Sequence, residues 1–223
     1  MKIKNIPFVH GGQDLSSNLE SILQKGLIPK GRNIKEIDIA AGNGNCISLR
    51  LARVNANFGS GEILVINPDV SDLPGVRFYT RELYGIGNDI RRYLTGSEFE
   101  QPNSILHKEL LNKIISSERE KTVSRGLSTS GNDLFAKLIK SPEFREYLSA
   151  YALSKNEFYK KFEKKCSLIG CTLQEFFERS PYSREWLINE DICIPKVVQP
   201  NFLLGYWDGN DFRNFGRILQ TPR

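Results

Sequence analysis

The sequence predicts an α+β fold in which a β-rich frame is interrupted by a long helical block. Short apolar runs bounded by turn residues, a pattern typical of strands, fill much of the first 80 residues and return near the end of the chain. From about Glu82 to Arg184, by contrast, apolar residues recur at helical spacing among many charged side chains. We therefore expect a single domain over residues 1–223, with a helical insertion at about 82–184.

The first half begins with a short predicted strand, IPFV, and continues into a helix whose apolar residues recur from Leu19 to Leu27. Gly26 lies where a helix C-cap is expected. Further strands are predicted at Cys46–Ala52, Glu62–Ile66 and Val76–Thr80. The segment NPDVSDLPG supplies turn residues between the last two of these strands.

The helical block and the last strands complete the predicted order. Ser-Pro pairs mark helix starts at Ser141-Pro142 and Ser180-Pro181. In KNEFYKKFEKK the aromatic residues have helical spacing, which favours a core face with lysines in solvent over a nucleic-acid surface. The runs EDICIPKVV and FLLGYW then predict two strands, joined by the turn-forming QPN.

Composition restricts the class of protein only weakly. The net charge of +5 and the pI of 9.0 favour a polyanionic partner such as nucleic acid, although a solvated basic surface explains them equally well. The sequence has no run of about 18 apolar residues for a membrane span, and its N-terminus lacks the pattern of a signal peptide. Four cysteines without a CxxC pair, and only two histidines, indicate reduced thiols in a cytoplasmic protein and no metal site.

One glycine-rich segment, IDIAAGNGNCISLRLA, has the spacing of a class I methyltransferase. Asp38, Gly42 and Gly44 fit the D-x-x-x-G-x-G turn that follows a strand and holds S-adenosylmethionine. Asp69 lies close to where that fold needs an acidic residue for the ribose hydroxyls. The fold also needs further parallel strands soon afterwards, whereas a helical block follows here. An S-adenosylmethionine-dependent methyltransferase is therefore the alternative hypothesis.

The segments VHGG and NLESILQKGL together resemble the first motif of the ADP-ribosyltransferase superfamily. In that motif a histidine ends the first strand, a glycine follows, and a helix of the form N-x-x-x-I-L-x-x-G-L comes next. His10, Gly11 and Asn18 match it. The resemblance implies that these residues form part of an NAD site, in which His10 hydrogen-bonds the adenosine ribose and the backbone of Gly11 binds the nicotinamide amide. A bulky side chain after His10 would obstruct such an approach to the backbone.

A second segment, EWLINEDICIPKVVQPNFLLGYW, resembles the strand that carries the catalytic glutamate of this family. It fits the pattern E-φ-φ-φ-x-x-x-V-x-x-P, in which φ is apolar, with Glu190 in the place of the glutamate. Asp191 stands where an apolar residue is usual, so Glu185 is the fallback if the register slips.

The order of elements between the two motifs is most similar to the DarT-like branch, which modifies nucleic acid. CISLRLAR resembles a second strand that ends in an arginine, namely Arg53 or, as the alternative, Arg50. Tyr79 is the candidate for a stacking tyrosine, and the block at about 82–184 would enlarge an insertion that shapes the substrate cleft. The longer spacing from His10 to the helix is nearer to the poly-ADP-ribose polymerase branch. The resemblance covers the two flanks of the chain and not the helical block.

The resemblance implies a split β-sheet core and a mono-ADP-ribosyltransferase that transfers ADP-ribose from NAD to a macromolecule, with nucleic acid slightly favoured over protein. Glu190 would stabilise the positive charge that develops at the nicotinamide ribose, or take a proton from the attacking group. Arg53 would neutralise the pyrophosphate or position the acceptor. Such an enzyme would be a toxin, effector or defence enzyme in the cytosol of its own or a target cell, with an antitoxin or immunity protein as a further partner.

Each of these residues also has a simpler structural interpretation. His10 is then a surface or hydrogen-bonded histidine, Glu190 an exposed strand carboxylate, and the two arginines solvated charges at a strand edge. On this interpretation the chain is a non-catalytic binding module built on the helical block, which is the second alternative.

Overall fold

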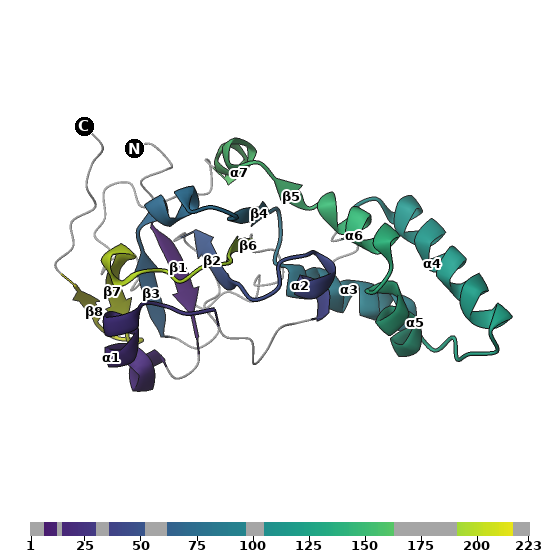
Figure 1. Cartoon of the computed structure of the whole chain (residues 1–223), viewed down its shortest axis with the longest axis horizontal. Helices are drawn as coiled ribbons and strands as arrows, with labels where there is room; N and C mark the ends of the chain where they lie inside the picture. Colours follow the sequence, from purple (N-terminus) through teal and green to yellow (C-terminus); the bar gives the residue numbers. More distant parts are fainter. Residues whose placement is uncertain are drawn as a thin grey trace. The chain divides into compact units, whose positions relative to one another are not determined.

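An antiparallel β-sheet built from both ends of the chain forms the frame of the structure (Figure 1). Within the described residues the protein is mixed α and β, which is compatible with the predicted α+β class. The computed structural model describes residues 7–12, 15–29, 36–51, 62–96, 105–162 and 191–215.

Strands and helices within these ranges follow the predicted alternation of a β-rich start, a helical middle and a β-rich end. The strands are β1 (Phe8–Gly11), β2 (Ile47–Leu51), β3 (Ile63–Ile66), β4 (Arg77–Tyr79), β5 (Ala152–Leu153), β6 (Asp191–Ile194), β7 (Leu203–Trp207) and β8 (Phe212–Asn214). The helices are α1 (Leu15–Lys25), α2 (Glu36–Ala40), α3 (Leu83–Thr95), α4 (Lys108–Ser124), α5 (Gly131–Leu138), α6 (Pro142–Ser149) and α7 (Lys155–Phe162). Two 3-10 turns are η3 (Pro68–Asp72) and η6 (Pro200–Phe202).

The strand order β5-β4-β6-β2-β1-β3-β7-β8 places β1 near the middle of the sheet, between β2 and β3. β6, from the C-terminal part of the chain, lies between β2 and β4 and is antiparallel to both. Directly opposed residues of antiparallel strands have their side chains on the same face of a sheet. The register therefore decides which side chains from distant segments come together.

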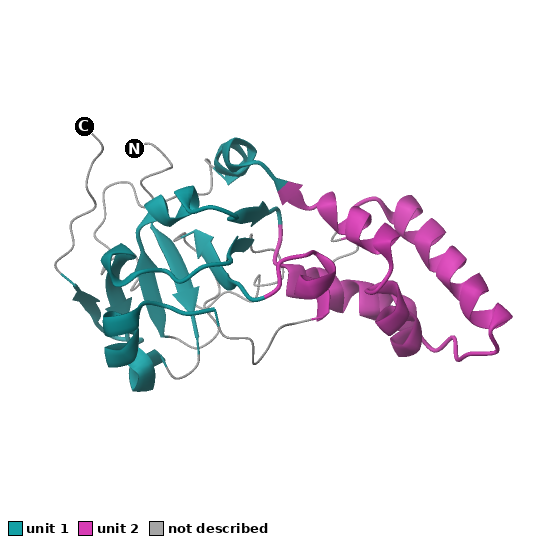
Figure 2. Cartoon of the chain, viewed as in Figure 1, with its two compact units in different colours: residues 1–31, 45–80, 153–223 teal, residues 32–44, 81–152 magenta. Residues whose placement is uncertain are grey.

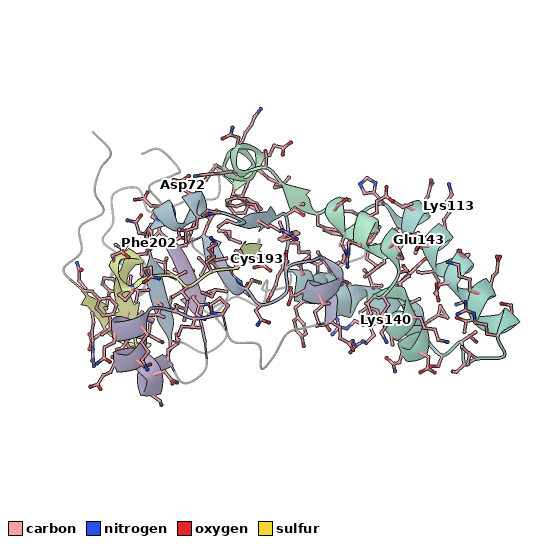
Figure 3. All side chains as sticks on the ribbon, viewed as in Figure 1. Asp72, Lys113, Lys140, Glu143, Cys193 and Phe202 are labelled. Carbon is pink, nitrogen blue, oxygen red and sulfur yellow. The ribbon has the colours of Figure 1, made fainter. Side chains whose placement is uncertain are left out.

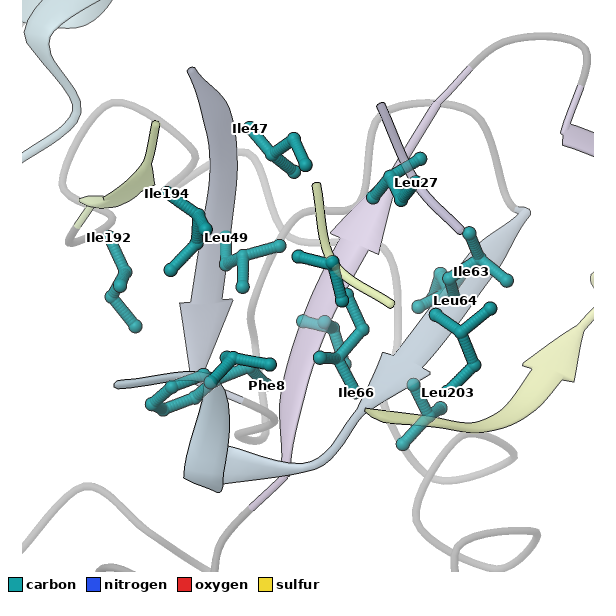
Figure 4. Packing of buried hydrophobic residues seen from close by; sticks show 14 of the residues in the cluster. Phe8, Leu27, Ile47, Leu49, Ile63, Leu64, Ile66, Ile192, Ile194 and Leu203 are labelled. Carbon is teal, nitrogen blue, oxygen red and sulfur yellow. The ribbon is translucent and has the colours of Figure 1, made fainter. Parts of the chain in front are cut away.

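The main hydrophobic core includes side chains from both faces of this sheet, because Phe8 and Val9 are consecutive in β1 and all four residues of β3 belong to it (Figure 4). Alternation along β2 buries its first, third and fifth residues and leaves Ser48 and Arg50 only half-buried. Phe158 and Phe162 of α7 belong to the same core, and the ring centroids of Phe158 and Phe78 lie 5.0 Å apart. The prediction that the aromatics of KNEFYKKFEKK face a core is thus confirmed for these two residues.

A glycine at the end of α1 allows the chain to pair with the segment after β6. Gly26 has a φ of +82°, and its amide donates to the carbonyl of Ile22 at 2.8 Å, which confirms the predicted C-cap. Leu27 forms an isolated antiparallel bridge with Val198 through two hydrogen bonds of 2.9 Å. A Cβ on Gly26 would lie 2.3 Å from the carbonyl oxygen of Val198, so this position requires glycine.

The chain divides into two units, which Figure 2 distinguishes by colour. The sheet unit comprises residues 1–31, 45–80 and 153–223, and the helical unit comprises residues 32–44 and 81–152. The helical unit therefore ends earlier than the predicted insertion at about 82–184, because α7 packs on β4 and belongs to the sheet unit. Residues 163–184 of the predicted insertion lie outside the described residues.

The helical unit has a hydrophobic core of its own. Leu134 of α5 and Phe144 of α6 are buried within it. The hydroxyl of Ser141 accepts a hydrogen bond from the amide of Phe144 at 3.2 Å, which confirms the helix start predicted from the Ser-Pro pair. Arg81 and Asp89, both buried, form an ion pair with a separation of 2.7 Å.

The glycine-rich segment IDIAAGNGN folds as a helix and a turn. Asp38 lies within α2, and Gly42 and Gly44 follow it with φ values of +76° and +58°. α2 packs on α3 and α6 in the helical unit. A class I methyltransferase requires a strand where this helix stands, so the expectation of a strand followed by a cofactor-binding turn is wrong for this segment.

Candidate functional site

Five of the predicted site residues lie on described elements of the sheet unit. His10 and Gly11 are on β1, Arg50 is on the adjacent β2, and Tyr79 is on β4. Asn18 is an exposed residue of α1, the helix that follows β1. His10 and Arg50 lie on neighbouring strands, and the charge of Arg50 acts on His10 as described below. Arg50 is opposite Val9, however, so its side chain and that of Tyr79 lie on the other face of the sheet from His10.

The predicted catalytic residues Glu190 and Arg53, together with the fallback Glu185, lie outside the described residues. Glu190 directly precedes Asp191 in the sequence, and Asp191 is the first residue of β6. β6 pairs with β2, which in turn pairs with β1. Two strand spacings, about 10 Å, therefore separate β6 from the strand of His10.

The imidazole of His10 is held in one tautomer by β2. Its Nδ1 lies 2.9 Å from the carbonyl oxygen of Ser48, and since a carbonyl only accepts, Nδ1 carries the proton. Burial lowers the pKa of His10, the hydrogen bond to Ser48 offsets part of this effect, and the positive charge of Arg50 lowers the pKa further. The neutral imidazole is therefore favoured, and its Nε2 is a hydrogen-bond acceptor.

A glycine that sequence reasoning did not single out lies beside this nitrogen. A Cβ on Gly12 would come within 3.7 Å of Nε2 of His10 and 3.3 Å of the side chain of Leu15. Glycine at residue 12 therefore places no side chain of its own against Nε2, and a Cβ there would be in van der Waals contact with this nitrogen. The preceding Gly11 is exposed. The motif assigned the unobstructed position to Gly11, and the structure adds Gly12 as a second glycine close to the imidazole.

Ser48 connects His10 with β6, a role that sequence reasoning also missed. Besides accepting from His10 through its carbonyl, Ser48 donates a hydrogen bond from its hydroxyl to Oδ1 of Asp191. The carboxylate of Asp191 is buried, with 3% of the residue exposed. The one signal in the sequence was the departure of Asp191 from the apolar pattern of its strand.

The side chains of Ser48 and Asp191 lie on one face of β2, β6 and β4, and the core residues Leu49, Ile192 and Phe78 lie on the other. Ser48, Cys193 and Arg77 are cross-strand partners in one row, and Asp191 and Tyr79 are partners in the next. Figure 3 labels Cys193 among the side chains of the sheet unit. Tyr79, the predicted stacking residue, is only 3% exposed, so little of its ring is available to a ligand in this arrangement.

A second cluster of polar side chains, formed by Glu62, Ser16 and Tyr206, lies at the start of α1, the helix that follows β1. Oε2 of Glu62 accepts from the amide of Ser16 at 3.1 Å, which satisfies a free N–H at the helix start. The hydroxyl of Ser16, followed by this amide, lowers the pKa of Glu62. Burial, followed by the adjacent Glu62, raises the pKa of Tyr206. Tyr206 and His10 share Leu64 as a strand partner, so both lie on one face of the sheet. The register of β3 with β7, which the sequence does not reveal, creates this arrangement.

Within the described ranges, no group of three or more His, Cys, Asp and Glu side chains comes together as a metal site. None of the helices described is long and apolar enough to span a membrane. Comparisons of the chain with protein-family models, curated proteins and solved structures found no match.

Proposed function

We propose that this chain is an NAD-dependent mono-ADP-ribosyltransferase, with the split-sheet core of that superfamily, that modifies a macromolecule in a cytosol. DNA or RNA is favoured slightly over protein as the acceptor, on the net charge of +5 and the DarT-like order of elements. A toxin, effector or defence enzyme of this kind would have an antitoxin or immunity protein as a further partner. One observation carries the proposal: His10, with Nε2 beside Gly12, lies on β1, two strands from the strand that follows Glu190.

The chemistry of His10 suits a ribose. Its Nδ1 proton is engaged by Ser48, so the neutral imidazole offers Nε2 to a hydroxyl donor, and a ribose hydroxyl is such a donor. The lowered pKa of His10 keeps this nitrogen unprotonated near neutral pH. Gly12 leaves room for the approach, because a Cβ there would lie near Nε2. These features support a site for the adenosine ribose of NAD at the end of β1.

In the proposed reaction the bond between nicotinamide and its ribose breaks, nicotinamide leaves with the bonding electrons, and the acceptor atom bonds to the ribose carbon. Glu190 would stabilise the positive charge on the ribose and take the proton that the acceptor loses. Arg53 would attract the pyrophosphate or position the acceptor, with Arg50 as the alternative, although Arg50 is opposite Val9 and so on the other face of the sheet from His10.

Radiolabelled NAD, incubated with the purified chain and separately with DNA, RNA or lysate protein, tests this function. We expect nicotinamide release and label transfer for the wild type, loss of both for Glu190→Gln, and a raised KM for NAD in His10→Ala. Glu20→Gln, which changes an exposed glutamate on α1, is the matched control and should keep full activity. Absence of release and transfer, with Glu190→Gln identical to the wild type, refutes the proposal.

The two alternatives make different predictions. A methyltransferase would be stabilised by S-adenosylmethionine rather than NAD in a thermal-shift measurement and would depend on Gly42 and Gly44. The helix at Asp38 and the antiparallel sheet disfavour it. A non-catalytic binding module would retain partner binding in the double variant His10→Ala/Glu190→Gln.

A further inference from the structure

We propose that Ser48 is a positioning residue that fixes the start of β6 relative to His10 for the transfer reaction. The inference rests on the proposed function and gives a role to two residues, Ser48 and Asp191, that the family motif does not assign. The carbonyl of Ser48 accepts from Nδ1 of His10 at 2.9 Å, and its hydroxyl donates to Oδ1 of Asp191. One residue of β2 thus holds both of its neighbouring strands with different atoms.

Asp191 is a costly residue to bury at the first position of β6. All four residues of β6 are buried, and the other three are apolar or a cysteine. A buried carboxylate is destabilising unless donors satisfy it, and the hydroxyl of Ser48 is one such donor. An apolar pair would pack here without that cost. The hydrogen bond between Ser48 and Asp191 is therefore better explained by a role in fixing the position of the first residue of β6 than by a gain in stability.

Because Ser48 contacts His10 through its carbonyl and Asp191 through its hydroxyl, a substitution of its side chain can change turnover without changing substrate binding. Its carbonyl belongs to the backbone, so Ser48→Ala keeps the hydrogen bond to His10 and removes only the one to Asp191. The residue that precedes Asp191 in the chain is Glu190, the proposed catalytic carboxylate. A misplacement of about 1 Å in a reacting group costs up to about 100-fold in rate. Loss of the hydroxyl should therefore lower kcat and leave the KM for NAD nearly unchanged.

Steady-state kinetics of nicotinamide release test this assignment. We expect Ser48→Ala to lower kcat by about 10- to 100-fold, and Ser48→Thr, which keeps a hydroxyl, to retain kcat within about threefold. The double variant Ser48→Ala/Asp191→Val makes both partners apolar, so it should unfold near the wild-type temperature while its kcat stays low. Ser71→Ala is the matched control, because it removes another buried hydroxyl of the sheet unit, bonded to Tyr159 at 3.3 Å. It should leave kcat unchanged.

Imidazole NMR adds a readout that does not depend on activity. The chain has only two histidines, His10 and His107, so a His107→Gln spectrum assigns the Nδ1–H signal of His10. That signal should persist in Ser48→Ala, which shows that the fold and the tether to β2 are intact.

The outcomes distinguish the inference from the function on which it rests. A wild type that releases no nicotinamide refutes the proposed function and, with it, the role of Ser48. An active wild type whose folded double variant turns over NAD at the wild-type rate overturns the role of Ser48 alone. Failure of Ser48→Thr to recover the activity lost in Ser48→Ala also overturns it, since the hydroxyl is then not the group that acts.

Discussion

Replacing Gly26 by alanine tests the tie between α1 and the segment after β6. At its φ of +82° an L-residue pays about 1–2 kcal/mol in conformational energy. The added Cβ would also lie 2.3 Å from the carbonyl oxygen of Val198, so the backbone must move. That movement breaks the two 2.9 Å hydrogen bonds between Leu27 and Val198, each worth about 1 kcal/mol net. The free energy of unfolding should therefore fall by about 3–4 kcal/mol.

Gly96→Ala is the matched control. Gly96 also caps a helix in the left-handed conformation, at a φ of +71° after α3, but nothing lies within 4 Å of the position of its Cβ. It should lose only the conformational part, about 1–2 kcal/mol. Urea unfolding measures both losses, and hydrogen exchange at the amide of Leu27 reports whether the bridge has opened. Equal losses for both variants, with the Leu27 amide still protected in Gly26→Ala, would refute the reasoning.

Three further predictions concern the site and the helical unit. Because the pKa of His10 is lowered from 6.5 in the folded chain, the unfolded chain binds more protons below pH 6.5; stability should be constant above that pH and fall below it, by at most about 1.4 kcal/mol per pH unit. Urea unfolding from pH 5 to 8 measures this, and an unchanged pH slope in His10→Gln would contradict it. Gly12→Val covers Nε2 of His10 and should raise the KM for NAD about tenfold or more, whereas an unchanged KM would exclude Nε2 as a contact. Asp89→Ala removes the carboxylate 2.7 Å from the buried Arg81 and should destabilise the helical unit by about 3–5 kcal/mol by hydrogen exchange; a loss below about 1 kcal/mol would contradict this.

Local signals made much of the secondary structure predictable. The alternation in ISLRL predicted β2, whose residues are alternately buried and half-buried. Gly26 predicted the end of α1, and Ser141 predicted the start of α6. α2 escaped prediction because it is short and stabilised by distant residues. A Cβ on Gly87 of α3 would lie 3.4 Å from the side chain of Ile37, so the fit between these helices depends on a glycine far along the chain.

The candidate site was predictable only where a motif marks it. The strands that carry His10 and Arg50 were predicted from local patterns, whereas the pairing of β1 with β2 follows from the register of the sheet. Ser48 and Asp191 were not paired in advance, since they are 143 positions apart and only the register of the complete sheet joins them. Tyr79 was singled out as an aromatic residue of the right kind, but its burial follows from the position of β4 beside β6.

The position of β6 has a consequence for how the protein is made. β2 and β4 emerge from the ribosome long before β6. Until β6 is made, the edge of β2 and the edge of β4 that pair with it have no strand partner. Contacts between segments so far apart in sequence form late and slowly. A nascent chain that stops before Asp191 contains β1 and His10 but lacks β6, the strand that pairs with both β2 and β4. The proposed activity would therefore begin only after β6 had been made and had paired with β2 and β4.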